Sequence, residues 1–168
     1  MLSVGKSRAY QLLPPQQLEA LSFLEANAEK FPTLLDGSPA IPDNSVDLYT
    51  VAFGIRNFTN PRIALREAWR ILRPGGVFAC LEFSKVQPNL PFLDTLYQRW
   101  SFSAIPLIGQ VVAGDRDSYQ YLVESIQRFP NQEEFRGMIE EAGFVVEGQG
   151  YENLTGGIAA IHRGMKPI

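Results

Sequence analysis

The chain has 168 residues, which is the usual size of one domain and enough to bury a hydrophobic core. Hydrophobic residues make up 45% of it and charged residues 20%, a composition typical of a folded globular protein rather than a disordered or coiled-coil one. The net charge of -3 provides no basic surface for a polyanion. We therefore expect no nucleic-acid partner.

Metal and disulfide chemistry have few candidate side chains in this sequence. Cys80 is the single cysteine, so no disulfide can form within the chain. His162 is the single histidine, which leaves too few nitrogen and sulfur ligands for the usual zinc sites. We expect no metal site, and a catalytic Ser-His-Asp arrangement would have to use the same histidine.

No targeting or membrane-spanning segment is predicted. Residues 1–10 lack the apolar stretch of a signal peptide. The most apolar run, Ala104 to Ala113, is interrupted by Pro106 and Gly109 and is too short to cross a bilayer. This run is interpreted as buried core or, alternatively, as a surface that faces a membrane or a lipid tail.

The N-terminal quarter predicts little regular structure. Leu2 to Leu13 predict a short helix that ends at Pro14 and Pro15, because proline cannot continue a helix. Leu21 to Ala26 predict a short strand. Phe31 to Asn44 contain three prolines and several turn residues, so they predict a surface loop.

A strand, a helix and a second strand follow. Val46 to Phe53 have the composition of a strand. Asn60 is a candidate N-cap with Pro61 at the first helical position, and apolar residues repeat with helical spacing over residues 61–73. Arg73 to Gly76 should end that helix before the nearly continuous apolar strand Val77 to Phe83. This order predicts an α/β fold with a parallel sheet and a right-handed crossover.

The rest of the chain predicts a helical insert, a further helix and a closing pair of strands. Asn131 and Glu134 have the spacing of a capping box, so a helix should begin there and end at Gly143. The remaining predicted segments are an aromatic-rich insert at 87–129 with helices near Phe92 to Phe102 and Ser118 to Phe129, and a hairpin of Phe144 to Tyr151 with Gly156 to Arg163.

Polar residues follow two predicted strands at the sheet edge where parallel sheets bind ligands. Asn27 offers a donor and an acceptor to the edge of a heterocycle, and the small Ala28 would let a flat ring approach the backbone; alternatively, Asn27 is an ordinary turn residue. Gly54 permits a tight turn after the next strand, and Arg56 and Asn57 add a permanent cation and an amide. The alternative for Arg56 is a surface charge beside a helix N-cap.

Seven segments carry a resemblance to the ubiquinone/menaquinone biosynthesis C-methyltransferase family over almost the whole chain. AFGIRN followed by SYQYLVESI is specific to that family, whereas ILRPGG occurs in many S-adenosylmethionine methyltransferases. The segments are Asn27-Ala28-Glu29, AFGIRNFTN (52–60), ILRPGG (71–76), CLEFSK (80–85), SYQYLVESIQRFP (118–130), MIEEAGF (138–144) and YENLTGGIAAIHRGMKP (151–167).

The resemblance implies a class I methyltransferase fold, Rossmann-like, with strand order 3-2-1-4-5-7-6. It implies S-adenosylmethionine as the cofactor and methyl transfer to a ring carbon of a polyprenylated benzoquinol. Arg56 is then expected to stabilise a phenolate and Asn57 to orient the hydroxyl or a water. Asn27 and Ala28 are expected at the adenine end of the cofactor. Glu82 and His162 are alternative bases, or structural residues.

The resemblance is nearest to the mitochondrial, ubiquinone-making branch. It implies the matrix side of the mitochondrial inner membrane, a peripheral membrane contact and a multi-enzyme quinone-biosynthesis complex. The insert at 87–129 is expected to cap the site and to supply an apolar path for the polyprenyl tail. The side chains expected to line that path are Phe92, Leu96, Tyr97, Trp100 and Ile105, with Pro106-Leu107-Ile108. Alternatively, these side chains pack on the sheet.

The sequence departs from the family pattern at the cofactor loop. No Gly-x-Gly-x-Gly motif occurs in it, so the usual backbone cradle for the methionine part is not encoded. Residues 1–168 are therefore interpreted as one N-terminally truncated methyltransferase domain. The alternative function is a catalytically inactive fragment that acts as a binding component of a quinone-biosynthesis complex.

Overall fold

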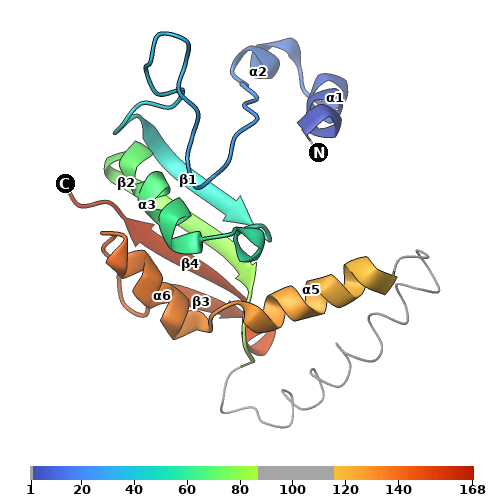
Figure 1. The fold of residues 1–168 in the computed structure, drawn as a ribbon, viewed down its shortest axis with the longest axis vertical. Coiled ribbons are helices and arrows are strands. Elements are labelled where there is room, and N and C mark those ends of the chain that lie inside the picture. The colour runs from blue at the N-terminus through green and yellow to red at the C-terminus, as the bar shows by residue number, and fades with distance from the viewer. Residues whose placement is uncertain (1, 87–115) are drawn as a thin grey trace.

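The computed structural model describes residues 2–86 and 116–168, and it places one four-stranded sheet at the centre of the molecule (Figure 1). Helices α3 and α6 cover one face of the sheet, whereas α1 and α2 stand apart from it (Figure 1). The elements are α1 (Leu2–Leu12), α2 (Pro15–Glu19), β1 (Val46–Ala52), η1 (Ile55–Asn57), α3 (Pro61–Ile71), β2 (Leu72–Phe83), α5 (Arg116–Arg128), α6 (Gln132–Glu141), β3 (Tyr151–Leu154), η3 (Thr155–Gly157) and β4 (Ala159–Met165).

The sheet has the order β1-β2-β4-β3. β1 and β2 are parallel and are joined through α3, which confirms the predicted strand-helix-strand unit and the α/β fold class. β4 pairs antiparallel with both β2 and β3. This order corresponds to the 4-5-7-6 part of the strand order that the resemblance implies.

Helix α3 begins where the sequence predicts. The Asn60 side chain accepts hydrogen bonds from the backbone N–H groups of Arg62 and Ile63, and Pro61 occupies the first turn. The helix ends at Ile71, two residues before the predicted end, because Leu72 already has extended backbone angles. The next residues already belong to β2, which begins five residues before the predicted Val77, and Gly75 N–H donates to the carbonyl of Lys166, just after β4, at 2.9 Å.

One hydrophobic core lies between the sheet and helices α3 and α6. α3 contributes Leu65, β2 contributes Phe78, and α6 contributes Phe135 and Ile139, all of them 0–1% exposed. The predicted capping box of α6 is confirmed, since Asn131 and Glu134 each accept a hydrogen bond from the other's backbone N–H at 2.9 Å.

The predicted strand at Leu21 to Ala26 is wrong. These residues have no regular structure, and Leu21 and Leu24 are each 44% exposed. A strand is stable only when a neighbour pairs with its backbone, and among the described residues none does. Only an isolated bridge between Asn27 and Lys30 follows.

The closing hairpin forms, but later than predicted. Of the predicted strand Phe144 to Tyr151, only Tyr151 belongs to a strand, and Val145 forms one isolated bridge with Met165. Gly150 has a φ of +74°, in the left-handed region, so the chain turns there before β3 begins. The predicted helix near Ser118 to Phe129 is confirmed as α5, and that near Phe92 to Phe102 lies outside the described residues.

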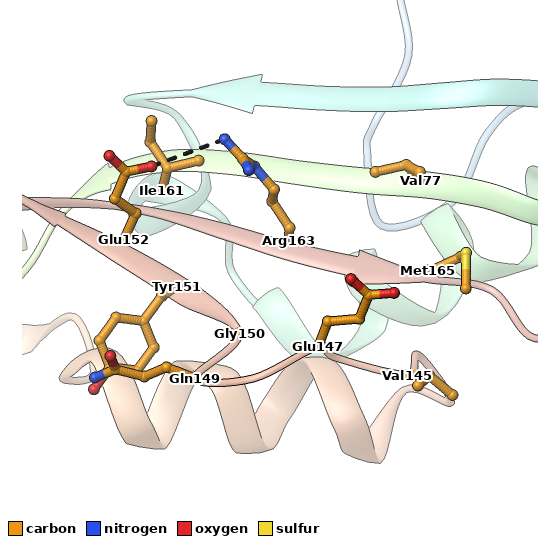
Figure 2. A pocket seen from close by; sticks show the side chains of 11 residues that line it. Val77, Val145, Glu147, Gln149, Gly150, Tyr151, Glu152, Ile161, Arg163 and Met165 are labelled. Atoms are coloured by element: carbon orange, nitrogen blue, oxygen red, sulfur yellow. Dashed lines mark ion pairs between the residues drawn. The ribbon is translucent and has the colours of Figure 1, made fainter.

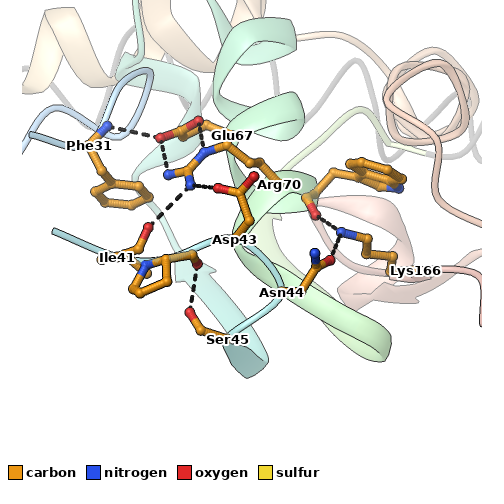
Figure 3. A network of polar contacts seen from close by, with 10 residues as sticks. Phe31, Ile41, Asp43, Asn44, Ser45, Glu67, Arg70 and Lys166 are labelled. Atoms are coloured by element: carbon orange, nitrogen blue, oxygen red, sulfur yellow. Dashed lines mark hydrogen bonds and ion pairs between the residues drawn. The ribbon is translucent and has the colours of Figure 1, made fainter. Parts of the chain in front are cut away.

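The predicted loop at Phe31 to Asn44 is confirmed, and a polar network holds it against α3 (Figure 3). Glu67 accepts from the Phe31 backbone N–H at 3.1 Å and from Arg70, whose hydrogen bond lowers the pKa of the Glu67 carboxyl. Arg70 also donates to the Ile41 carbonyl at 3.2 Å and pairs with Asp43. The loop is therefore fixed to α3, next to the amino end of β1.

Lys166 extends this network to the other end of the chain (Figure 3). Its ammonium donates to the side-chain oxygen of Asn44 at 2.7 Å and to the Trp69 carbonyl at 2.8 Å, and it lies 3.8 Å from the centroid of the Trp69 ring. The cation–π contact and the two acceptors compensate for the burial of the charge.

Two glycines give opposite expectations for stability. At Gly164 in β4, an added Cβ would lie 2.8 Å from Ile139 Cγ2 and 2.9 Å from Phe144 Cβ. We expect Gly164→Ala to lower the free energy of unfolding by about 1–3 kcal/mol in urea titrations. Gly137→Ala is the matched control, because an added Cβ meets nothing within 4 Å in helix α6, and it should stabilise the chain by about 0.5–1 kcal/mol. Equal effects would contradict this packing.

Candidate active site

The carboxyl ends of β1 and β2 lie side by side and carry the predicted catalytic residues. Phe53 N–H donates to the Leu81 carbonyl at 2.8 Å, although Phe53 has a φ of +52°, which a bulky residue rarely adopts. Ile55, 1% exposed, anchors the short helix η1 that carries Arg56 and Asn57. Strained backbone next to polar side chains is a frequent feature of functional sites.

Arg56 forms a buried ion pair with Glu82 from the end of β2. The two side chains are 10% and 1% exposed, and Arg56 Nη1 lies 2.8 Å from Glu82 Oε1. The same Nη1 donates to the Phe53 carbonyl at 2.5 Å, and the guanidinium carbon lies 5.4 Å from the centroid of the Phe83 ring. Three contacts therefore fix the orientation of the guanidinium.

Two nitrogens of Arg56 remain without a hydrogen-bond partner within residues 2–86 and 116–168. Nε is buried and unpaired, and no described residue accepts from Nη2. Because Nη2 is not enclosed, it is the donor that a ligand at the strand ends would reach. The predicted position of Arg56 at the ligand edge of the sheet thus fits a hydrogen bond to a phenolic oxygen.

Asn57 contacts a residue whose role the sequence did not reveal. Tyr121 of α5 donates from its hydroxyl to Asn57 Oδ1 at 3.2 Å. The ring of Tyr121 is 53% exposed, so it stands at the open side of the site. The two residues are separated by 63 others in the sequence, and no spacing pattern pairs them; only the family-specific segment at 118–130 could have drawn attention to Tyr121.

The predicted adenine-binding residues lie in a turn next to the start of α3. Asn27 Oδ1 accepts from the Glu29 backbone N–H at 2.9 Å, and Glu29 Oε1 accepts from the Asn60 backbone N–H at 2.8 Å. Asn27 is exposed and Ala28 is half-buried. The roles of Asn27 and Ala28 in cofactor binding stay predictions.

S-adenosylmethionine fits these residues only at its adenine end. The side-chain amide nitrogen of Asn27 donates to no other residue described, so it is available to a heterocycle. Ala28 presents no side chain that would block a flat ring. No glycine-rich loop for the methionine part is encoded in this sequence, and no described cluster of His, Cys, Asp or Glu could hold a metal ion.

His162 is packed among aromatic side chains in the described structure. It is 2% exposed on β4 and lies between the rings of Phe135 and Tyr151, whose centroids are 4.9 and 5.2 Å from its own. Its Nε2 lies 3.0 Å from the Gln132 carbonyl, which accepts only, so Nε2 carries the hydrogen. Burial lowers the pKa of His162, and the structural interpretation of this residue is favoured over that of a base.

Stability should therefore depend on pH through His162. The unfolded chain binds a proton near the ordinary pKa of 6.5, whereas the folded chain resists it. The free energy of unfolding should fall as the pH drops from about 7.5 to about 5.5, by at most ~1.4 kcal/mol per pH unit. His162→Gln retains a donor for Gln132 and should remove this slope; an equally steep slope in the variant would contradict the assignment.

A pocket lies elsewhere, beside β3 and β4 (Figure 2). It is lined by Val77, Ile161 and Met165, which alternate along their strands with buried residues of the core and therefore face the other side of the sheet. Its rim carries an exposed ion pair between Glu152 and Arg163, 3.9 Å apart. An exposed ion pair contributes little free energy. It does not hold a charge in place as the buried pair of Arg56 and Glu82 does, so we place the reaction at the buried pair.

None of the helices within residues 2–86 and 116–168 combines the length and the apolar composition that crossing a bilayer requires. The proposed tail path from Phe92 to Ile105 lies outside these ranges.

Comparisons with known proteins identify the family. The model of the ubiE/COQ5 methyltransferase family matches residues 1–166. A ubiquinone/menaquinone biosynthesis C-methyltransferase UbiE from Brucella canis is 53% identical over 166 residues, covering 99% of this chain and 56% of that protein. The mitochondrial 2-methoxy-6-polyprenyl-1,4-benzoquinol methylase of Schizosaccharomyces pombe is 53% identical over 167 residues, covering 99% of this chain and 52% of that protein. The chain thus spans about half the length of these relatives.

Solved structures support the same fold. A SAM-dependent methyltransferase from Aquifex aeolicus matches with a TM-score of 0.58 at 16% identity, over 98% of this chain and 62% of that one. Another from Thermotoga maritima matches with a TM-score of 0.54 at 20% identity, over 89% and 66%. The class I methyltransferase fold that the resemblance implied is therefore confirmed. Because the family model covers nearly the whole sequence, this chain belongs to the ubiE/COQ5 methyltransferase family.

Proposed function

We propose that this chain methylates a ring carbon of a polyprenylated benzoquinol in ubiquinone biosynthesis, with S-adenosylmethionine as the methyl donor. The observation that carries the proposal is the guanidinium of Arg56, fixed by Glu82 at the joint end of β1 and β2 with Nη2 left for a ligand. The relatives that share this sequence are named as quinone-biosynthesis methyltransferases.

The chemistry requires a ring carbon that is more nucleophilic than in a neutral phenol. S-adenosylmethionine, when bound, would supply the methyl group of its sulfonium and would be left as the neutral thioether S-adenosylhomocysteine. Negative charge develops on the phenolic oxygen beside the reacting carbon, and Arg56 Nη2 donates to that oxygen. Asn57, held by Tyr121, orients the hydroxyl or a water that carries the proton away. The new carbon–carbon bond replaces a ring C–H bond, so one proton leaves the ring for solvent.

Asn27 and Ala28 are proposed to hold the adenine. Glu29 fixes their turn to Asn60, which directly follows the loop of Arg56 and Asn57. This hydrogen bond supports the proposal, because it holds the proposed cofactor segment next to the segment that follows Arg56 and Asn57.

The location and partners are proposed from the named relative. A mitochondrial benzoquinol methylase is 53% identical to this chain, which supports a mitochondrial location. The polyprenyl tail of the substrate would partition into a membrane, so we place the protein on the matrix side of the inner membrane as a peripheral component. A multi-enzyme quinone-biosynthesis complex would deliver such a poorly soluble substrate.

A binding component without activity is the second candidate, because the sequence encodes no glycine-rich cofactor loop. Isothermal titration of the chain with S-adenosylmethionine separates the two. Micromolar binding that is weakened by Asn27→Ala, but not by Gln17→Ala on the exposed helix α2, supports the methyltransferase. Transfer of a deuterated methyl group to a ring carbon of a short-tailed benzoquinol would establish it. Absence of both binding and transfer favours the binding component.

A further inference from the structure

Glu82 cancels the charge of Arg56 inside the site. Its carboxylate is 1% exposed and accepts three hydrogen bonds: from Arg56 Nη1 at 2.8 Å, from Arg56 N at 3.3 Å and from Phe83 N at 2.9 Å. Such a carboxylate cannot turn away from the guanidinium without leaving buried donors unpaired. The pair therefore acts as one neutral unit with its positive end toward the ligand.

The same contacts occupy the part of Arg56 that recognises anions. A guanidinium binds a carboxylate or phosphate tightly through two parallel N–H donors and its net charge. Here Nη1 already donates to Glu82 and to the Phe53 carbonyl, and Nε is buried. What remains for a ligand is Nη2, as a directed donor without net charge behind it.

We propose that Glu82 determines specificity: it makes the site bind an uncharged phenol and reject a ligand that arrives as an anion. This inference rests on the proposed function and concerns the same site. When the phenol binds uncharged, donation from Nη2 strengthens as charge develops on the phenolic oxygen, which raises turnover more than ground-state binding. Without Glu82, the charge of the guanidinium would not be compensated, and the site would bind phenolates and carboxylates more tightly.

The test uses 4-nitrophenol, whose ionised form is seen directly in its absorption spectrum, so that the pKa of the bound phenol can be titrated on the whole chain. In the wild type we expect that pKa to lie no more than about two units below its value in water, a factor of about 100 in the relative affinity of the two forms. Glu82→Gln should lower it by about one further unit, because the cation of Arg56 is no longer compensated.

Three control variants separate the possible results. Arg56→Gln and the double variant Arg56→Gln/Glu82→Gln should lose the shift, because neither retains the cation; Glu82→Asp, which keeps the charge, should behave as the wild type. Circular dichroism verifies that each variant is folded. Should Glu82→Gln not fold, the wild type itself decides: a bound phenol with its pKa lowered by more than about two units would overturn the proposal.

The outcomes also distinguish this inference from the proposed function. If Arg56→Gln weakens nitrophenol binding while Glu82→Gln leaves the pKa of the bound phenol at its wild-type value, Glu82 is only structural and the inference fails alone. If Arg56→Gln binds nitrophenol as the wild type does, the acceptor site is misplaced and both fail.

Discussion

Replacing Arg56 by alanine is expected to reduce turnover in methyl transfer to a benzoquinol by about 10²- to 10³-fold, the usual loss when one donor to a developing oxyanion is removed. Affinity for S-adenosylmethionine should change much less, because the charge that Arg56 stabilises arises mainly in the transition state. Steady-state kinetics of deuterated methyl transfer measure the first quantity and isothermal titration the second. Where turnover of this chain is too low to follow, the matching arginine of a longer family member is the position to change.

The same substitution also leaves Glu82 buried without its partner, at a cost of about 3–5 kcal/mol in stability. Kinetics must therefore be measured at a temperature where the variant is folded. Arg163→Ala is the matched control, since its pair with Glu152 is exposed and 3.9 Å long, and turnover should not change. Turnover of a folded Arg56→Ala variant equal to that of the wild type would remove Arg56 from the mechanism.

Phe135→Ala is expected to lower the free energy of unfolding by about 3–5 kcal/mol. The Phe135 side chain is 0% exposed and packs against the rings of Phe129 and His162, at centroid distances of 5.0 and 4.9 Å. Its removal would leave a cavity at the junction of α6 with β4, where the closing strands join the core. Urea or thermal unfolding followed by circular dichroism measures the change.

Leu12→Ala is the control for that change, because Leu12 is 77% exposed at the end of α1. Its effect should stay within about 0.5 kcal/mol. If Phe135→Ala cost no more than Leu12→Ala, the core described between the sheet, α3 and α6 would be wrong.

Local signals in the sequence were sufficient for the central part of the fold. Asn60 and Pro61 define the start of α3, and the capping box of Asn131 and Glu134 defines the start of α6. The apolar run of β2 indicates a strand, although only one of its faces is fully buried and not both as the run predicts. Each of these features depends on residues within one element, so the chain order of strand, helix and strand could be predicted.

Features that depend on pairing between distant segments could not be predicted. Leu21 to Ala26 have the composition of a strand, but strand formation requires a neighbour that composition does not reveal. The first strand of the hairpin begins only at Tyr151, after the turn at Gly150, because pairing with β4 and not local composition decides where it starts.

The same contrast holds for the candidate site: the sequence indicates some of its residues, and only the fold reveals the partners of those residues. Arg56 and Asn57 were found because they directly follow a strand, at the edge where parallel sheets bind ligands. The partners that hold them, Glu82 and Tyr121, lie 26 and 64 positions away from them, and only the fold brings these side chains together.

The quinol ring is proposed to bind at the carboxyl ends of β1 and β2. Nuclear magnetic resonance titration of the isotopically labelled chain with a short-tailed benzoquinol would locate the ring. We expect the largest shifts in the guanidinium of Arg56, the amide group of Asn57 and the ring of Tyr121, and we expect Asn57→Ala to weaken binding. Shifts centred instead on Glu152, Ile161 and Arg163, which line the pocket beside β3 and β4 in Figure 2, would contradict this proposal.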